Sequence, residues 1–111
     1  AQMSADHSLV AEMVRSGRLT KAEAKTYPGR NLITRAVGVD SSVEADVYEI
    51  KMHEGQTLLL CSDGLSGPVT DAEIAAAVSQ APTMEQACTR LIELACKAGG
   101  NDNITVVLYT K

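Results

Sequence analysis

Phenylalanine and tryptophan are absent from this sequence of 111 residues, and aromatic residues make up only 3% of it. The core must therefore be built from Leu, Ile, Val, Ala and Met. No apolar run approaches the roughly 18–20 residues that cross a bilayer, and the polar N-terminus lacks the apolar stretch of a signal peptide. The net charge of −4, without a basic stripe or interleaved aromatics, excludes a typical nucleic-acid-binding surface. We expect neither a nucleic acid partner nor a membrane segment in this chain.

Paired cysteine motifs are also missing. The three cysteines include no CxxC pair. On one helix, Cys88 and Cys96 would lie about 12 Å apart, which is too far for a disulfide. A reducing cytoplasm is the expected location.

What the sequence does contain is an ordinary globular balance, with 45% hydrophobic and 22% charged residues. This length suits one domain or part of one. Helix-start signals are frequent, because a Thr is followed three residues later by Glu or Gln at three places. These capping boxes are Thr20 with Glu23, Thr70 with Glu73, and Thr83 with Gln86. They predict a short helix to about residue 26, a helix through residue 78 and a longer one through residue 98, in addition to an apolar helical stripe over residues 7–16.

Strand patterns fill the remaining stretches, at residues 32–37, 43–50, 57–62 and 104–110. The last two are nearly all apolar, which predicts central, buried strands. The order is helix, helix, three strands, two helices and a strand, which is typical of the α+β class with an antiparallel sheet and flanking helices. Helices on one face leave the other face uncovered, so we expect a partner sheet outside this chain and self-association through the exposed sheet surface.

Two acidic loops flank the two most apolar strands. Asp63 follows the strand at 57–62, and Asp102 precedes the strand at 104–110. If these strands are antiparallel neighbours, both carboxylates lie at the same sheet edge, where a cation would relieve their repulsion. Oxygen ligands without His or Cys favour Mg²⁺ or Mn²⁺ over Zn²⁺. The alternative is ordinary turn chemistry, since Asp-Gly and Asn-Asp-Asn are both common in loops that bind nothing.

Longer motifs narrow the choice. Residues 58–65 (LLLCSDGL), 70–74 (TDAEI) and 99–107 (GGNDNITVV) closely resemble the last two motifs of the protein phosphatase 2C family, also called PPM, the metal-dependent Ser/Thr protein phosphatases. Residues 6–10 (DHSLV), the helix start at 19–20 and residues 30–38 (RNLITRAVG) look like the flap region of the bacterial members and the strand after it. The resemblance covers essentially the whole chain. It implies the C-terminal part of an α/β/β/α sandwich, with a flap-like segment and following strand at 1–38 and the C-terminal sheet and helices at 39–111.

The resemblance also implies an activity. Members dephosphorylate phosphoserine and phosphothreonine in proteins, using water activated by two Mg²⁺ or Mn²⁺ ions, with a third ion possible near the flap. By motif position, Asp63 and Asp102 would be metal ligands, and Gly64 and Asn103 would support them. Arg30 and Arg35 are the flap candidates for contact with a phosphorylated substrate. The implied partners are phosphorylated Ser/Thr proteins and a cognate Ser/Thr kinase.

The family's N-terminal motifs are absent from these residues. They include the Asp-Gly motif whose aspartate bridges both metals, the phosphate-binding Arg and the proposed general-acid His. The isolated chain is therefore expected to bind metal weakly and to turn over little. Two alternatives stay open: a non-catalytic half-domain or pseudo-phosphatase that acts as a binding module, and a regulator phosphatase acting on a phosphorylated anti-sigma-type protein.

Overall fold

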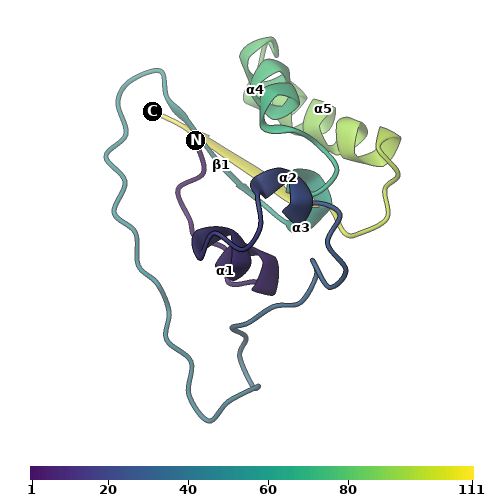
Figure 1. Ribbon diagram of the computed structural model, residues 1–111. Coiled ribbons are helices and arrows are strands. Elements are labelled where there is room, and N and C mark those ends of the chain that lie inside the picture. The colour runs from purple at the N-terminus through teal and green to yellow at the C-terminus, as the bar shows by residue number, and fades with distance from the viewer. The chain divides into compact units, whose positions relative to one another are not determined.

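The computed structural model describes all of residues 1–111, and these form two units, Ala1–Ile50 and Lys51–Lys111. Figure 1 shows the contrast between them: the second unit carries the strands and the longest helix, whereas the first has two short helices followed by an extended stretch. This division differs from the boundary expected at residues 38–39, and the flap-like segment at 1–38 stays a prediction.

The first unit is built from two capped helices. Helix α1 (Leu9–Arg15) begins after Ser8, whose side chain accepts a hydrogen bond from the Ala11 backbone N–H. Helix α2 (Lys21–Ala24) begins after Thr20, and both bonds of the predicted capping box with Glu23 are present. These helix starts are confirmed because capping depends on residues only three positions apart. Neither helix contains a buried residue.

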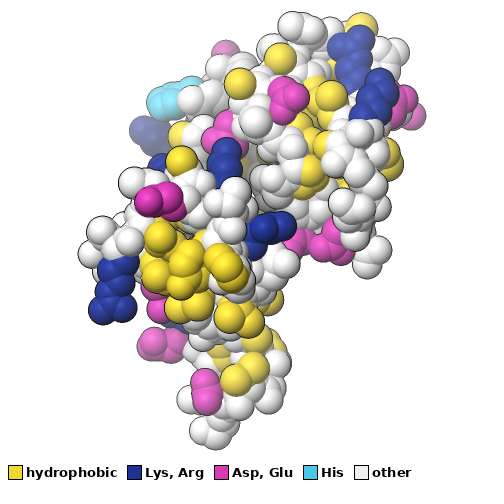
Figure 2. All heavy atoms as spheres, turned by 45° about the vertical axis from the view of Figure 1, so that its right-hand side comes forward, with side chains coloured by type: hydrophobic (Ala, Val, Ile, Leu, Met, Phe, Trp, Pro, Cys, Tyr) yellow, Lys and Arg dark blue, Asp and Glu magenta, His cyan; other side chains and the backbone are white.

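The strands predicted at 32–37 and 43–50 are wrong, because neither segment forms a ladder. The first makes only an isolated bridge between Ser8 and Ile33. A strand needs a neighbour that pairs with its backbone N–H and C=O groups along its length. The first segment is paired only from Leu32 to Thr34, with residues 7–9, and residues 43–50 pair with no strand in this unit. Their apolar side chains stay in solvent accordingly; Val37 is 89% and Val47 88% exposed. Figure 2 shows hydrophobic side chains at the surface of the molecule.

The second unit contains one antiparallel sheet of two strands. Strand β1 (Thr57–Cys61) pairs with β2 (Val106–Thr110), with Thr57 opposite Thr110 and Cys61 opposite Val106. The predicted antiparallel neighbours are thus confirmed, whereas the expected sheet of four strands is wrong. The predicted α+β class with flanking helices holds.

Helices cover one face of this sheet. They are α3 (Asp63–Ser66), α4 (Asp71–Ser79) and α5 (Met84–Lys97), and Figure 1 shows α4 and α5 side by side. Both predicted capping residues are in place: Thr70 forms a complete capping box with Glu73, and Thr83 accepts from the Gln86 N–H. The core is centred on two fully buried side chains, Leu65 and Leu91. Helix α3 was not predicted.

The two faces of the sheet differ in burial. Leu59 and Leu108 form one cross-strand pair and pack against the core. The next pair, Leu60 and Val107, lies on the opposite face and is 54% and 53% exposed. The strands are thus buried on one face only, which agrees with the expectation that helices cover a single face of the sheet, whereas the expected central, fully buried position does not hold within this unit. No helix in the structure has the length and apolar character required to span a membrane.

Candidate functional site

The loop that leaves β1 is fastened to the loop that enters β2 through Ser62. Its hydroxyl donates to the Asn103 carbonyl oxygen and accepts from the Thr105 backbone N–H, both at 2.9 Å. Its own backbone N–H donates to the Thr105 carbonyl at 3.1 Å, which continues the strand pairing beyond Cys61. Two segments far apart in sequence are thereby held together at one end of the strand pair.

Gly64, which follows Asp63 in the sequence, also contacts the loop that enters β2. This residue is buried, and a Cβ atom placed on it would lie only 2.3 Å from the Asn103 carbonyl oxygen. Only glycine permits the two backbones to approach so closely. Asp63 lies between Ser62 and Gly64, which both contact Asn103, and Asp102 directly precedes Asn103. The structure therefore brings the two acidic loops together.

Both acidic side chains are exposed at this junction. Asp63 is the first residue of α3, and its carboxylate accepts no hydrogen bond from the protein. One oxygen of Asp102, Oδ1, accepts the Asn103 backbone N–H at 2.7 Å. Asn103 thus acts through its backbone, which contacts both Ser62 and Asp102. Carboxylate oxygens on both loops stay free to bind a cation.

The ligands at this junction are of the chemical type that a hard divalent cation binds, but there are too few of them to complete its coordination. Two carboxylates without His or Cys are the ligands that Mg²⁺ and Mn²⁺ prefer. Such a cation takes about six oxygen ligands. Nowhere in residues 1–111 do three His, Cys, Asp or Glu side chains gather in a way that could hold a metal ion. The chain can supply part of a metal centre, and the roles of Asp63, Asp102, Gly64 and Asn103 there stay predictions.

The two flap candidates, Arg30 and Arg35, belong to the first unit and differ in their contacts. Arg35 Nη1 donates to Asp46 Oδ1 at 2.8 Å and to the Glu44 carbonyl oxygen at 3.2 Å. The side chain of Arg30 is exposed and makes no hydrogen bond or ion pair. Arg35 is therefore already paired, whereas Arg30 is free.

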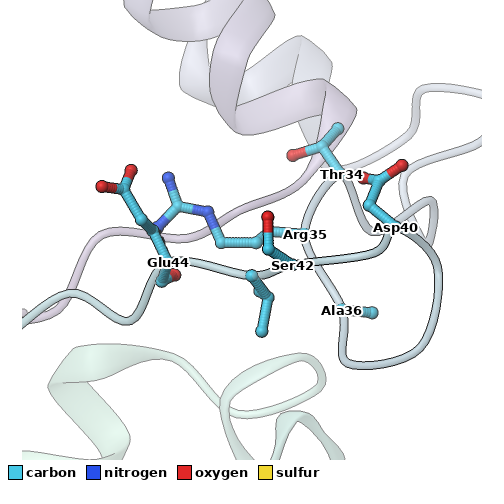
Figure 3. Close-up of a pocket in the computed structure, with 7 residues that line it drawn as sticks. Thr34, Arg35, Ala36, Asp40, Ser42 and Glu44 are labelled. Atoms are coloured by element: carbon cyan, nitrogen blue, oxygen red, sulfur yellow. Dashed lines mark hydrogen bonds between the residues drawn. The ribbon is translucent and has the colours of Figure 1, made fainter.

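Arg35 also lines an open hollow of about 470 Å³. Figure 3 shows its side chain reaching toward Glu44, while Thr34 and Asp40 lie on the other side. The two carboxylates outnumber the single guanidinium, whose charge is already balanced by Asp46. This hollow is thus poorly suited to an anionic phosphoryl group.

Asp46 is the centre of a polar cluster that the sequence interpretation missed. Its Oδ2 atom lies 2.7 Å from His7 Nε2 and accepts the Tyr48 hydroxyl at 3.2 Å, in addition to the Arg35 contact. Hydrogen bonds from Arg35, His7 and Tyr48 lower the pKa of the Asp46 carboxyl below its usual value. The available signal was weak: polar residues alternate with apolar ones along 43–50, and the pattern does not show which polar residue finds partners.

Cys61, just before the junction, does not have the properties of a reactive thiol. All three cysteines are free, and although Cys61 is exposed by area, partial burial of its thiol raises its pKa, which a hydrogen bond from Ser66 only partly offsets. The thiolate is therefore disfavoured at neutral pH.

Comparisons with known proteins relate this chain to phosphatases. A family model described as Stage II sporulation protein E (SpoIIE) matches residues 5–110. The serine/threonine phosphatase stp of Listeria innocua is 40% identical over 110 residues, which is 99% of this chain. Among solved structures, the Mycobacterium tuberculosis serine/threonine phosphatase PstP/Ppp superposes with a TM-score of 0.89 at 42% identity, over 97% of this chain and 45% of that one.

A further solved structure contains metal. It is the catalytic domain of the serine/threonine protein phosphatase PstP in complex with two manganese ions, with a TM-score of 0.83, 41% identity, and coverage of 97% of this chain and 44% of that one. This chain likewise spans only 44% of the length of the Listeria relative.

Proposed function

This chain belongs to the Stage II sporulation protein E (SpoIIE) family and is the C-terminal half of a PPM phosphatase domain, and from this premise we propose that it takes part in metal-dependent dephosphorylation of phosphoserine and phosphothreonine in proteins. The observation that carries the proposal is the junction of the two acidic loops, where Ser62 and Gly64 both contact Asn103. Relatives named as serine/threonine phosphatases support it.

In this proposal, Asp63 and Asp102 contribute carboxylate ligands to a centre of two, or with the flap three, Mg²⁺ or Mn²⁺ ions. When bound, a divalent cation lowers the pKa of water, orients it and neutralises charge on phosphoryl oxygens. The chain's own residues provide two exposed carboxylates on loops whose backbones are fastened together. That fastening limits how far the two ligands can move apart, which favours the bound geometry before a cation arrives.

For the substrate, we propose that Arg30 contacts the phosphorylated protein, because its guanidinium is exposed and unpaired and can form bidentate bonds with a phosphate. Arg35 has its charge balanced by Asp46, and it contributes mainly by holding the segment that carries it.

The proposed partners are phosphorylated Ser/Thr proteins and the kinase that modifies them. The reducing cytoplasm is the proposed location, in keeping with three free cysteines. The exposed sheet face is proposed to pair with a second copy when this chain is alone.

The test uses hydrolysis of a phosphothreonine peptide by the full-length protein in Mn²⁺. Asp63→Asn and Asp102→Asn should each lower the rate by roughly 100-fold or more, since a metal ion supplies several kcal/mol of transition-state stabilisation and about 1.4 kcal/mol is tenfold. Asp71→Asn is the matched control, because this exposed aspartate opens α4 in the way that Asp63 opens α3. Full activity in either of the first two variants would refute the ligand assignment.

The second candidate is a non-catalytic binding module, and the missing third ligand favours it for the chain on its own. The two candidates differ in what they predict for the 111 residues and for the gene. The chain alone should show negligible hydrolysis, and robust turnover by it would contradict the incomplete site. An upstream Asp-Gly-x-Gly-Gly segment in the gene would favour the enzyme, and its absence would favour the binding module.

A further inference from the structure

Ser62 is the only residue whose side chain forms hydrogen bonds between the two acidic loops. It directly precedes Asp63, and both of its side-chain partners, Asn103 and Thr105, lie within three positions of Asp102. The hydroxyl uses its donor on the Asn103 carbonyl and an acceptor lone pair on the Thr105 N–H. Because both partners belong to the backbone of one loop, the two hydrogen bonds together fix the rotamer of Ser62 and the distance between the two loops.

We infer that Ser62 is a positioning residue, which sets the spacing between Asp63 and Asp102 and thereby the affinity of the junction for a divalent cation. The inference rests on the proposed function. In this role Ser62 touches neither the cation nor the substrate, and it acts through the two carboxylates.

The backbone alone fixes this spacing less tightly. One backbone hydrogen bond, from Ser62 N–H to the Thr105 carbonyl, remains when the hydroxyl is removed, and it lies at the end of the ladder where strands fray. Without the hydroxyl of the half-buried Ser62, the Asn103 carbonyl and the Thr105 N–H, which belong to exposed residues, lose these partners. Water can replace each bond separately, but it cannot tie the two groups to the residue that precedes Asp63.

The chemistry suggests a discriminating pair of variants. Ser62→Ala removes the hydroxyl. Ser62→Thr keeps it, and the extended backbone of Ser62, with φ −78° and ψ 164°, is one that a β-branched residue readily adopts. A matched control is Ser79→Ala, which removes a hydroxyl that donates to the Ala76 carbonyl at 3.2 Å in α4.

The experiment measures Mn²⁺ affinity of the full-length protein by titration and hydrogen exchange of the Thr105 amide by NMR. Ser62→Ala should weaken Mn²⁺ binding by about 10-fold or more, the usual effect of losing a residue that orients metal ligands. Exchange of the Thr105 amide should quicken, because its acceptor is gone. Ser62→Thr should restore both, and Ser79→Ala should change neither. In activity assays, the Mn²⁺ concentration for half-maximal rate should rise in Ser62→Ala while the KM for the peptide stays constant.

The outcomes separate this inference from the proposed function. If Asp63→Asn and Asp102→Asn lose Mn²⁺ affinity while Ser62→Ala binds Mn²⁺ like the unaltered protein, the inference is overturned and the proposed function stands. If neither aspartate variant loses affinity, the proposed function is overturned, and the inference with it. A purely structural role for Ser62 would lower the melting temperature without shifting Mn²⁺ affinity below that temperature, and it too would overturn the inference.

Discussion

The carbonyl oxygen of Asn103 lies 2.3 Å from the place where a Cβ atom on Gly64 would stand. Real Cβ atoms essentially never come so close to another heavy atom, and the obstacle is backbone, which cannot rotate away as a side chain could. Gly64 is therefore required by the contact between the two loops and not by its own backbone angles, since it is not among the glycines with positive φ.

Gly64→Ala should destabilise the protein and separate the two loops. The cost expected for an added methyl group in a tightly packed place is about 1–3 kcal/mol. Denaturant unfolding followed by circular dichroism measures it. Mn²⁺ affinity should fall in the same variant, because the carbonyl that must move belongs to the residue after Asp102. An unchanged midpoint of unfolding would show that the contact relaxes without cost.

A second glycine provides the control for that experiment. Gly17 has φ +75° and no atom within 4 Å of its Cβ position. Gly17→Ala should thus cost only the backbone strain, about 1 kcal/mol, with no effect on Mn²⁺ binding.

Thr70→Ala should destabilise the second unit by removing a helix cap. The Thr70 hydroxyl accepts the Glu73 N–H and donates to Glu73 Oε2, while the Thr70 N–H donates to the same carboxylate. Loss of such a cap costs about 1 kcal/mol. Thr83→Ala, which removes only one bond to the Gln86 N–H, should cost less. Thermal unfolding of both variants gives the comparison, and the reverse order would contradict the importance of the reciprocal bonds.

These caps also show what could be predicted from the sequence. A capping box involves residues three apart, so Thr20, Thr70 and Thr83 predict their helix starts without knowledge of the remaining fold. The meeting of the Asp63 and Asp102 loops was predictable for a related reason. The two most apolar segments pair, and antiparallel pairing puts the end of one strand beside the start of the other.

The remaining features depend on partners that a local pattern does not identify. Residues 43–50 have strand-like alternation, but a ladder needs a neighbouring strand, and the segment has none within its unit. In the Asp46 cluster, His7 and Asp46 are 39 positions apart, and no residue near either of them in the sequence indicates their contact. The sequence shows Ser62 only as part of a motif. The role of its hydroxyl depends on the Asn103 carbonyl and the Thr105 amide, and the sequence does not show that these groups lie beside it.

The Asp46 cluster predicts an acid-sensitive first unit. Arg35 first, then His7 and Tyr48, lower the pKa of Asp46 in the folded state. A carboxyl with a lowered folded-state pKa adds stability above its unfolded-state pKa and loses it as the pH falls through the lowered one. The contribution should thus be complete above about pH 4 and disappear below it. NMR shifts of the Arg35 and Tyr48 side chains, followed between about pH 2 and 6, measure the transition.

Two substitutions check that assignment. Asp46→Asn should abolish the transition, because the amide does not titrate in this range. Asp40→Asn is the control, since the Asp40 carboxylate lies in the same stretch of chain and makes no ion pair or hydrogen bond. A transition that persists in Asp46→Asn would assign the acid sensitivity to another carboxyl group.

Val107→Lys should reduce self-association of the 111-residue chain. Val107 is paired with Leu60 on the uncovered face of the sheet, where both side chains are more than half exposed, and a buried lysine would oppose contact with a second copy. Sedimentation velocity over a range of concentrations measures the effect. Thr110→Lys is the matched control, because Thr110 pairs with Thr57 on the other face. A chain that stays monomeric without any substitution would refute the proposed pairing, and equal dissociation by both lysines would assign the effect to charge alone.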